Sequence, residues 1–178
     1  MYVNGESTKR RNTRGFTLIE LLVVVSIITL LATIVISSVN KARVRSQYAR
    51  AQTEMQEFVD ISTYSRGEAS KTLYQLSGNN CSDCVCRTGL SMINDVGSCY
   101  SNWLNVLTKV QTAANGVYTN VTRFDRDPWG SPYLLDENEG ESGGCGYDIF
   151  RTAGPDGIVG TSDDYGLSIP HSSPACPN

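Results

Sequence analysis

Apolar residues fill one long stretch near the start of the chain, from Phe16 to Val39, in which Glu20 is the only charged side chain. As a helix at 1.5 Å per residue, this stretch of about 24 residues would be about 36 Å long. The hydrocarbon core of a bilayer is roughly 30 Å thick, so the pattern predicts a helix that spans a membrane with some tilt. A charged carboxylate near the centre of such a span costs at least ~2.5 kcal/mol, so we expect Glu20 to need a partner.

Beyond Val39 the pattern changes to that of a one-sided helix. Larger or apolar residues recur three or four positions apart, which places them on one helical face: Val44, Tyr48, Ala51, Met55 and Phe58. No proline or glycine interrupts residues 16–66, and Gly67 is the first expected stop. We therefore predict one helix of about 50 residues, with a transmembrane half at 16–39 and an amphipathic half at 40–66 that packs on the rest of the chain.

Residues 67–178 are expected to form a single globular domain. Residues 67–100 are rich in Ser, Asn, Gly and Cys with little periodicity, which favours a loop. A short helix is predicted at 101–114, because four apolar residues are spaced for one helical face: Trp103, Val106, Leu107 and Val110. Asn115-Gly116 would end that helix.

Strands are predicted at three places in the same domain, residues 117–124, 133–135 and 147–150, because β-branched and aromatic residues recur there. An acidic, glycine-rich turn at 136–146 would join the last two. Small antiparallel strands covered by the amphipathic half of a long helix predict an α+β fold.

The residues ahead of the apolar stretch are basic, with Lys9, Arg10, Arg11 and Arg14 against a single Glu6. An ordinary secretory signal has a shorter apolar region followed by a small-residue cleavage site. Here the small residue, Gly15, comes before the apolar stretch, so cleavage there would release residues 1–15 as a hydrophilic leader. Basic residues also follow the stretch, so the positive-inside rule does not decide its orientation.

Charge and composition argue against two classes of function. The chain carries a formal net charge of −3 at pH 7, and the leader contributes three net positive charges, which leaves about −6 on the remainder. That balance argues against nucleic-acid binding driven by net charge. His171 is the only histidine, so a histidine-based nucleophile or a multi-histidine metal site is not expected, and we predict that the protein is not an enzyme.

The cysteines all follow the apolar stretch: Cys81, Cys84, Cys86, Cys99, Cys145 and Cys176. An even number confined to the part outside the membrane predicts up to three disulfides in an oxidising compartment. The short spacing of the first four indicates a stapled loop, which leaves the last two to tie down the tail. A zinc site built from the first three, with Cys99 as fourth ligand, is the alternative.

The start of the apolar stretch carries the most specific motif in the chain, Gly15-Phe16-Thr17-Leu18-Ile19-Glu20-Leu21. It resembles the class III signal of type IV pilins and pseudopilins at every position. The resemblance implies a pilin-like fold, cleavage after Gly15 by a prepilin peptidase and N-methylation of the new terminal Phe16. It also implies a partner for Glu20, namely the terminal amine of a neighbouring subunit, because two charges that are unpaired in lipid become a neutralised pair on assembly.

The same resemblance implies that the chain forms a homo-oligomeric helical filament, with residues 16–39 as the membrane and assembly half of the helix. It also implies an inner-membrane platform protein and a cytoplasmic assembly ATPase as partners. The cysteines and the resemblance together place the carboxyl-terminal domain outside the cytoplasm. The chain would be a single-pass membrane protein before assembly and part of a pilus or pseudopilus afterwards. Many pilins carry a proline near the middle of the membrane half, where this chain has Ser37-Ser38; whether the helix unwinds on assembly therefore stays open.

The second candidate site is the acidic, glycine-rich segment from Asp156 to Asp164. Calcium prefers about six to eight hard oxygen ligands, and Gly157 and Gly160 allow a loop to curl so that carbonyls turn inward. The order of residues does not fit the helix-loop-helix calcium pattern. Composition alone therefore leaves a solvated acidic turn as an equal alternative.

Three segments in and around that loop favour the hypothesis that it binds calcium: Asp127-Pro128-Trp129-Gly130-Ser131-Pro132-Tyr133, Asp148-Ile149-Phe150 and Gly154 to Asp164. Together they resemble the carboxyl-terminal region of the major pseudopilin of type II secretion, which implies a calcium ion bound by this loop. The implied ligands are the carboxylates of Asp156, Asp163 and Asp164, with an oxygen from Thr161 or Ser162. Trp129 and Tyr133 are expected to be core aromatics that anchor the turn.

The sequence is compatible with three functions. The first is a major pseudopilin-like structural subunit of a type II secretion system, which the tryptophan turn and the acidic loop favour. The second is a type IV pilin for adhesion, motility or DNA uptake, which disulfides that resist shear favour. The third is a membrane-anchored binding protein that never polymerises.

Overall fold

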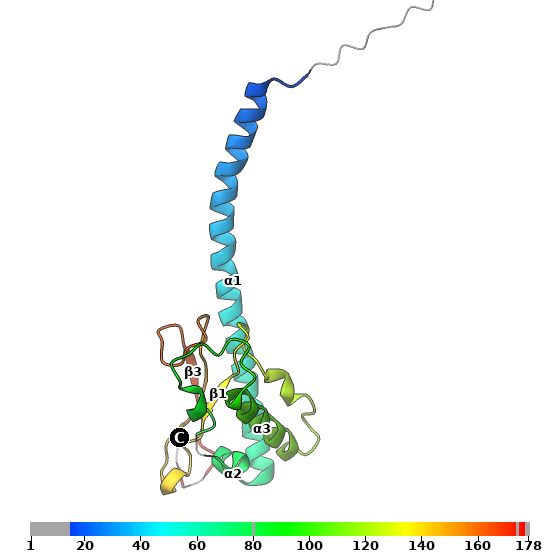
Figure 1. Cartoon of the computed structure of the whole chain (residues 1–178). Coiled ribbons are helices and arrows are strands. Elements are labelled where there is room, and N and C mark those ends of the chain that lie inside the picture. The colour runs from blue at the N-terminus through cyan, green and yellow to red at the C-terminus, as the bar shows by residue number, and fades with distance from the viewer. Residues whose placement is uncertain (1–14, 80, 174, 177–178) are drawn as a thin grey trace, which may run out of the picture. The chain divides into compact units, whose positions relative to one another are not determined.

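The computed structural model describes residues 15–79, 81–173 and 175–176. The chain divides into two compact units, one that ends at Arg43 and one that begins at Val44. Helix α1, Leu18–Ala69, is 52 residues long and contributes to both units (Figure 1). This length agrees with the predicted single helix, although Gly67 lies inside it. The turn that follows α1 is made by Ser70, which has a φ of 52°.

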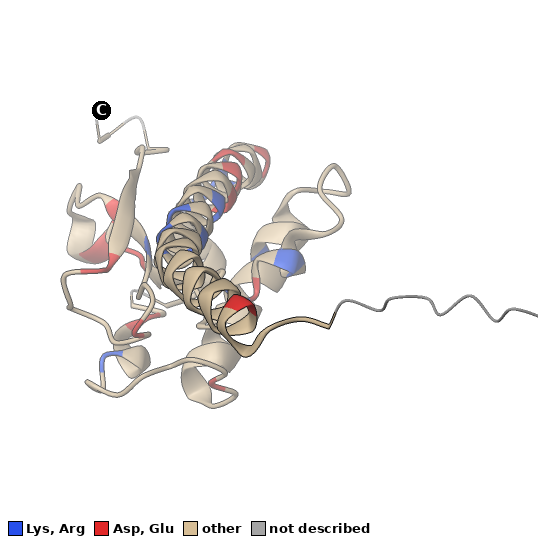
Figure 2. Ribbon diagram, turned by 90° about the horizontal axis from the view of Figure 1, so that it is seen from above, with Lys and Arg blue, Asp and Glu red and all other residues tan. Residues whose placement is uncertain are grey.

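The first unit is the apolar start of α1. Its described residues are all exposed, and its most apolar window has a mean hydropathy of 2.8 with 0% of it buried. In Figure 2 the ribbon is tan between an acidic band at the start of α1 and the basic residues further along. The hydroxyls within this stretch donate to carbonyls of the same helix, including those of Ser26, Thr33, Ser37 and Ser38. Its length and composition suit a membrane span in which the backbone and hydroxyls are satisfied internally.

The core of the second unit forms where α1 meets helix α3, Ser98–Ala113, and the sheet. Phe58 of α1 lies at the centre, with its ring centroid 5.2 Å from that of Trp103 and 4.5 Å from that of Phe150. Ala51 and Met55 are buried on the same face, as the periodicity predicted. Val44 is 42% exposed, so the buried face begins later than expected. The described core therefore starts at Ala51, about three turns into the amphipathic half.

The sheet has three antiparallel strands in the order β1 (Leu134–Asp136), β2 (Asp148–Thr152) and β3 (Tyr165–Ile169). Leu135 pairs with Phe150, and Phe150 pairs with Leu167. The predictions at 133–135 and 147–150 are confirmed within a residue or two. β3 was not predicted. Its residues are mostly half-buried or exposed, so they give only a weak strand pattern.

The strand predicted at 117–124 is wrong. Only Val121–Phe124 is regular there, and it is a 3₁₀ helix, η2. Val121 and Phe124, three positions apart, are both buried, as expected for a 3₁₀ turn. The backbone is held by side chains of α3 rather than by a strand partner: the Nε1 of Trp103 donates to the Phe124 carbonyl at 2.7 Å, and Gln111 accepts from the Val121 N–H at 2.9 Å.

Residues 67–100 contain more regular structure than the expected loop. Helix α2, Leu73–Ser77, begins with a capping box, in which Thr72 accepts from the N–H of Gln75 and Gln75 accepts from the N–H of Thr72. A 3₁₀ turn, η1, covers Cys84–Cys86, and α3 begins at Ser98 rather than at residue 101. Figure 1 shows these elements gathered around the part of α1 that belongs to the second unit.

The six cysteines form three disulfides, Cys81–Cys84, Cys86–Cys99 and Cys145–Cys176. The first two staple the segment before α3 and the third ties the tail, which is the grouping that their spacing indicated. The zinc alternative is not supported, because a cysteine in a disulfide offers no thiolate to a metal.

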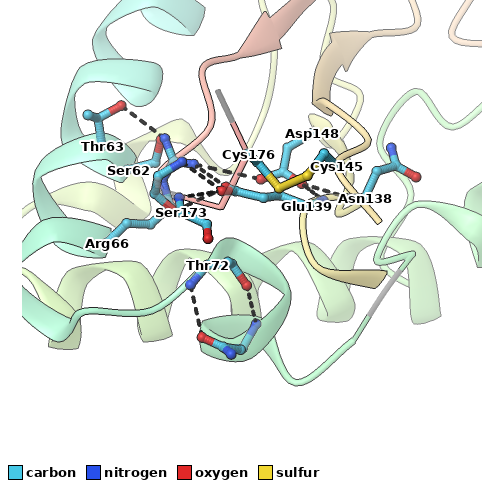
Figure 3. A network of polar contacts seen from close by, with 12 residues as sticks. Ser62, Thr63, Arg66, Thr72, Asn138, Glu139, Cys145, Asp148, Ser173 and Cys176 are labelled. Atoms are coloured by element: carbon cyan, nitrogen blue, oxygen red, sulfur yellow. Dashed lines mark hydrogen bonds and ion pairs between the residues drawn. A yellow bond between two sulfur atoms is a disulfide. The ribbon is translucent and has the colours of Figure 1, made fainter. Parts of the chain in front are cut away.

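A buried ionic cluster joins the end of α1 to the hairpin between β1 and β2 (Figure 3). The side chain of Arg66 is 0% exposed, and its guanidinium lies 3.0 Å from the Glu139 carboxylate and 3.9 Å from that of Asp148. Asp148 also accepts from the backbone N–H groups of Asn138 and Glu139 at 2.7 and 2.8 Å. Removing one partner from such a cluster leaves a buried charge uncompensated, so the three groups depend on one another.

Glu139 also holds the tail of the chain. It accepts from the N–H groups of Ser172 at 2.7 Å and Ser173 at 2.6 Å, and from the Ser172 hydroxyl at 3.0 Å. The Cys145–Cys176 disulfide closes the same region covalently (Figure 3). One carboxylate therefore links the long helix, the hairpin and the tail.

Glu137 is a second interior carboxylate of the segment expected to be an acidic turn. It is fully buried and accepts from the N–H of Ser82 at 2.8 Å and from the Ser82 hydroxyl at 2.5 Å. Burial raises the pKa of Glu137 from 4.5 to about 7. Burial also raises the pKa values of Asp83, Asp127 and Asp148. These four carboxyl groups therefore lie in the interior rather than in solvent.

The raised pKa of Glu137 predicts that the second unit loses stability as the solution becomes alkaline. A carboxyl whose folded-state pKa lies above its unfolded value stabilises the fold fully below about 4.5, and this contribution is lost as pH rises through about 7. At ~1.4 kcal/mol per pH unit, the free energy of unfolding should fall by up to roughly 3 kcal/mol from this group. Urea unfolding of the detergent-solubilised chain, followed across this range, measures the change.

Glu137→Gln should flatten that part of the pH profile, because a neutral amide imitates the protonated acid. Glu68→Gln, at an exposed position on α1, is the matched control and should leave the profile unchanged. If the wild-type chain is equally stable at mildly acidic and mildly alkaline pH, Glu137 is not a protonated interior group.

Candidate functional site

The start of α1 holds the first candidate site. Thr17 precedes the first helical residue, and Glu20 lies three positions further on. The Oε2 of Glu20 accepts from the N–H of Thr17 at 2.9 Å and from its hydroxyl at 2.8 Å, while the Thr17 hydroxyl accepts from the N–H of Glu20 at 3.3 Å. This reciprocal pattern is a capping box, which satisfies two backbone donors at the helix start.

The capping box gives the lone carboxylate a fixed place on the helix surface. Both bonds from Thr17 end on the same oxygen of Glu20. Phe16, one residue before Thr17, is 82% exposed, and no atom lies within 4 Å of the space beside Gly15. Residues 1–14 of the expected leader lie outside the described residues. The Gly15-Phe16 bond and the Glu20 carboxylate are thus both exposed in the single chain.

The acidic loop between β2 and β3 holds the second candidate site. Three glycines take positive φ in it, at Gly154, Gly157 and Gly160. A Cβ on Gly154 would lie only 2.4 Å from the carbonyl oxygen of Asp163, so the two ends of the loop close on each other where only glycine fits. The backbone therefore forms the curled loop that the sequence indicated.

The loop's carboxylates accept backbone N–H groups of the loop itself. Asp156 accepts from Ile158 at 2.7 Å, Asp163 from Asp156 at 3.1 Å, and Asp164 from Gly160 at 2.8 Å. The three carboxylates do not all lie within 4.8 Å of one another; in the described part of the chain, that spacing is reached by Cys81, Asp83 and Cys84. Ser162 is exposed. The sequence-predicted ligands thus share one loop but do not converge as a group.

Thr161 is the point at which the loop's oxygens come closest. Its hydroxyl contacts the carbonyl of Ile158 at 3.2 Å, one oxygen of Asp164 at 3.3 Å and one oxygen of Asp163. The Thr161 hydroxyl lowers the pKa of Asp163. A hydroxyl carries a single proton, so it can satisfy only one of these three acceptors at a time. This spot is rich in hard oxygens and poor in donors, which is the composition that suits a calcium ion.

The loop is supported from two neighbouring segments. The hydroxyl of Tyr48, on α1 within the second unit, donates to the Asp163 carbonyl at 2.9 Å. The ring of Tyr48 lies edge-to-face against Trp129, with centroids 4.8 Å apart. On another side, Ser91 donates to the Asp156 carbonyl at 2.7 Å. Tyr133 is buried, as expected of a core aromatic, whereas Trp129 is only partly buried.

Comparison with known proteins decides the family. The family model described as the prokaryotic N-terminal methylation motif matches residues 10–36. The type II secretion system core protein G of Escherichia coli (strain K12) is 32% identical over 163 residues, which cover 87% of this chain and 92% of that protein. The protein of that name from Pectobacterium carotovorum subsp. carotovorum is 31% identical over 164 residues, covering 91% of this chain and 87% of its own length.

The chain belongs to the core protein G family, the major pseudopilins of type II secretion. The core protein G of Aeromonas hydrophila is also similar, at 29% identity over 160 residues, or 89% of this chain and 94% of that protein. No solved structure matches the chain. The α+β arrangement and the family both agree with the expectations from the sequence.

The methylation-motif model matches the part of this core protein G relative that contains Gly15, Phe16 and Glu20. The curated relatives extend the similarity over most of the second unit. The first candidate site therefore lies in the part of the chain that the family model covers.

Asp127 is an organising residue whose role was not predicted from the sequence. It is buried, and it accepts from the N–H groups of Trp129 at 3.0 Å and Ser131 at 2.9 Å and from the Thr152 hydroxyl. These bonds fix the tryptophan turn against β2. The signal was present in the sequence, since an aspartate directly before a proline and a glycine-containing turn often accepts the turn's N–H groups.

Proposed function

We propose that this core protein G relative is the structural subunit of a type II secretion pseudopilus. The observation that carries the proposal is the apolar first unit, which is wholly exposed in the single chain. Such a surface is stable only when lipid covers it before assembly and other helices cover it afterwards. The curated relatives are named for a component of that secretion system, which supports this assignment over the other filament types.

Assembly begins, in this proposal, with cleavage after Gly15 and methylation of Phe16. Removal of the leader creates a positive amine one residue before the capped start of α1. Glu20 of one subunit then pairs with the Phe16 amine of a neighbour as the helices leave the lipid. The pair offsets two charges that are costly in hydrocarbon, so correct axial register is the arrangement of lowest free energy.

The proposed partners follow from the same steps. They are a prepilin peptidase, an inner-membrane platform protein, an assembly ATPase in the cytoplasm, and further copies of this chain. The domain that begins at Val44 would lie outside the cytoplasm, where three disulfides are chemically stable. The relatives are named as core proteins of the type II secretion system, and we infer a structural rather than an enzymatic role.

Replacing Glu20 by Ala should abolish pseudopilus formation and exoprotein secretion, while insertion of the protein into the membrane persists. The variant removes the partner of the Phe16 amine without shortening the apolar helix. Exoprotein assays and electron microscopy of cells that carry only the variant provide the readouts, with Glu68→Ala, at an exposed site far along α1, as the control. A Glu20→Ala protein that assembles normally would show that register is set elsewhere.

The same cells distinguish a secretion pseudopilus from a surface pilus. Loss of secretion on deletion of the gene is expected for the pseudopilin. Long surface filaments that vanish on deletion, with secretion intact, would instead favour a pilin for adhesion, motility or DNA uptake, a role that three disulfides would also suit.

We further propose that the loop from Asp156 to Asp164 binds calcium. The residues that would hold the ion are Asp156, Asp163 and Asp164, with Thr161 or Ser162 and backbone carbonyls. Support comes from the three acceptor oxygens that share the single Thr161 proton, an arrangement that a cation would relieve. A bound ion would neutralise the carboxylates and hold the loop against the turn at Trp129.

Calcium chelation is therefore expected to lower the melting temperature of the purified chain. A site held at a hundred times its dissociation constant stabilises the fold by about 2.7 kcal/mol, which corresponds to a few degrees in a domain of this size. Asp163→Ala should remove the sensitivity to chelator, and Asp60→Ala, an exposed acid on α1, should retain it. If chelation leaves the melting temperature of the wild-type chain unchanged, the loop is an ordinary acidic turn that binds no calcium.

A further inference from the structure

One of the three disulfides has surroundings unlike those of the other two. Cys81–Cys84 closes a loop with a sequence separation of only 3, against 13 for Cys86–Cys99 and 31 for Cys145–Cys176. The constraint that a disulfide places on the unfolded chain grows with the length of the loop it closes, so this bond contributes least to stability by that route. Stabilisation by loop closure therefore does not by itself explain the role of the Cys81–Cys84 disulfide.

The sulfur of Cys81 lies beside a buried acid. Asp83 is 1% exposed, and its Oδ1 is 3.2 Å from the Sγ of Cys81. The other carboxyl oxygen, Oδ2, has no hydrogen-bond partner among the described residues and lies 3.4 Å from Arg151. A disulfide sulfur has no proton to donate, so the contact with Cys81 is a hydrogen bond only if Asp83 carries the proton or if Cys81 is a thiol.

Charged groups surround Asp83 on more than one side. Arg87, on the same turn, lies 2.7 Å from Oδ1, and Arg151 of β2 faces Oδ2. Asp136 of β1 binds both arginines, at 2.7 and 3.3 Å. Burial is the largest influence on Asp83 and raises its pKa, while the two arginines act in the opposite direction.

The backbone around this disulfide is held by bonds that do not involve sulfur. The N–H of Asp83 donates to the Leu135 carbonyl at 3.0 Å, and Ser82 is bound to the buried Glu137. The N–H of Cys86 donates to the Asp83 carbonyl at 2.9 Å. These bonds do not depend on the disulfide, so they would still hold the turn if it opened.

We propose that Cys81–Cys84 is a thiol–disulfide exchange site that accepts electrons from an external thiol. Cys84 is exposed and Cys81 is half-buried, so the incoming thiolate attacks the Sγ of Cys84. The new bond joins the external sulfur to Cys84, and the bond between Cys81 and Cys84 breaks. Cys81 leaves with the electron pair and takes a proton from Asp83.

A second external thiolate then attacks the external sulfur of the mixed disulfide and releases Cys84, which takes up a proton from solvent. Asp83 regains from solvent the proton that it gave to Cys81. In balance, one disulfide and two external thiols give two cysteine thiols and one external disulfide. Reoxidation by an external disulfide runs through the same steps in reverse. The chemistry is that of a thiol, whether it comes from a small molecule or from a protein dithiol.

Cys145–Cys176 is the internal control, because Cys145 is also exposed. Among the described residues, its two sulfurs lie against the backbone carbonyls of Ala175 and Gly144 rather than against an acid. If exposure alone governed exchange, these two disulfides would behave alike. If the arrangement around Asp83 governs exchange, the two disulfides will open at different thiol-to-disulfide ratios.

The test equilibrates the full-length chain in detergent with graded ratios of reduced to oxidised glutathione, blocks free thiols with N-ethylmaleimide and maps each disulfide by mass spectrometry. We expect Cys81–Cys84 to open at a thiol-to-disulfide ratio at least about tenfold lower than Cys145–Cys176, with an unchanged near-ultraviolet circular dichroism spectrum. Simultaneous opening, or opening only with loss of that spectrum, would overturn the proposal.

A second arm replaces glutathione by reduced thioredoxin at equal thiol concentration. Faster reduction by thioredoxin would assign the site to a protein dithiol, and faster reduction by glutathione would assign it to a small thiol. Failure of both to reduce Cys81–Cys84 in the folded chain would overturn the proposal. The outcome is independent of filament assembly, so it does not depend on the pseudopilus assignment.

The part played by Asp83 is tested by the pH profile of the reduction rate, expressed per external thiolate. In the wild-type chain this rate should fall as Asp83 loses its proton, and in Asp83→Asn that fall should be absent. Cys81→Ser provides a second measurement if Asp83→Asn does not fold. With oxidised glutathione it should form a mixed disulfide at Cys84; no adduct would show that this sulfur is not the point of attack.

Discussion

Helix α1 must be stable in two environments, an apolar one for its first part and the interior of a folded domain for its second part. The rest of the structure depends on how it meets both requirements. Up to Arg43, α1 exposes apolar side chains on all sides and satisfies its hydroxyls on its own carbonyls. Glu20 is the exception, and its capping box with Thr17 meets only local donors. The single chain therefore carries an apolar surface that suits lipid rather than water, and a charge that is costly in lipid; in the proposed function, assembly into a filament would cover the surface and pair the charge.

From Val44 onward the same helix serves as the main support of a small domain. Phe58 brings α1, α3 and the sheet together, so helix, helix and strands share one aromatic centre. Arg66, near the end of α1, extends the attachment with charge rather than apolar contact, since Glu139 and Asp148 bind it inside the domain. The disulfides Cys86–Cys99 and Cys145–Cys176 close loops that this short, three-stranded sheet would leave poorly constrained.

The elements with strong periodicity could be predicted from the sequence. α1 and α3 follow from apolar spacing, the first two strands from their residue types, and the grouping of cysteines from their positions. The strand predicted at 117–124 was wrong because β-branched and aromatic residues also suit a 3₁₀ turn when their partners are side chains such as Trp103 and Gln111. β3 was missed because Gly166 and Ser168 are exposed and weaken its pattern.

The interior charges were the hardest feature to anticipate. Glu137 and Glu139 lie in a segment whose composition is typical of a solvated turn, and only the tertiary partners Ser82 and Arg66 explain their burial. At the candidate sites, the motif from Gly15 to Leu21 identified the residues at the start of α1, whereas the role of Thr17 as their cap required the structure. The contact between Asp83 and Cys81 joins two residues only two positions apart, yet nothing in their order indicates that the acid is buried.

The most direct test of the central claim is the intact mass of the protein extracted from the membranes of its own cells. The account predicts a polypeptide that begins at Phe16, carries one added methyl group and is lighter by two hydrogens for each of its three disulfides. A mass that corresponds to a chain beginning at Met1 without the methyl group would contradict it.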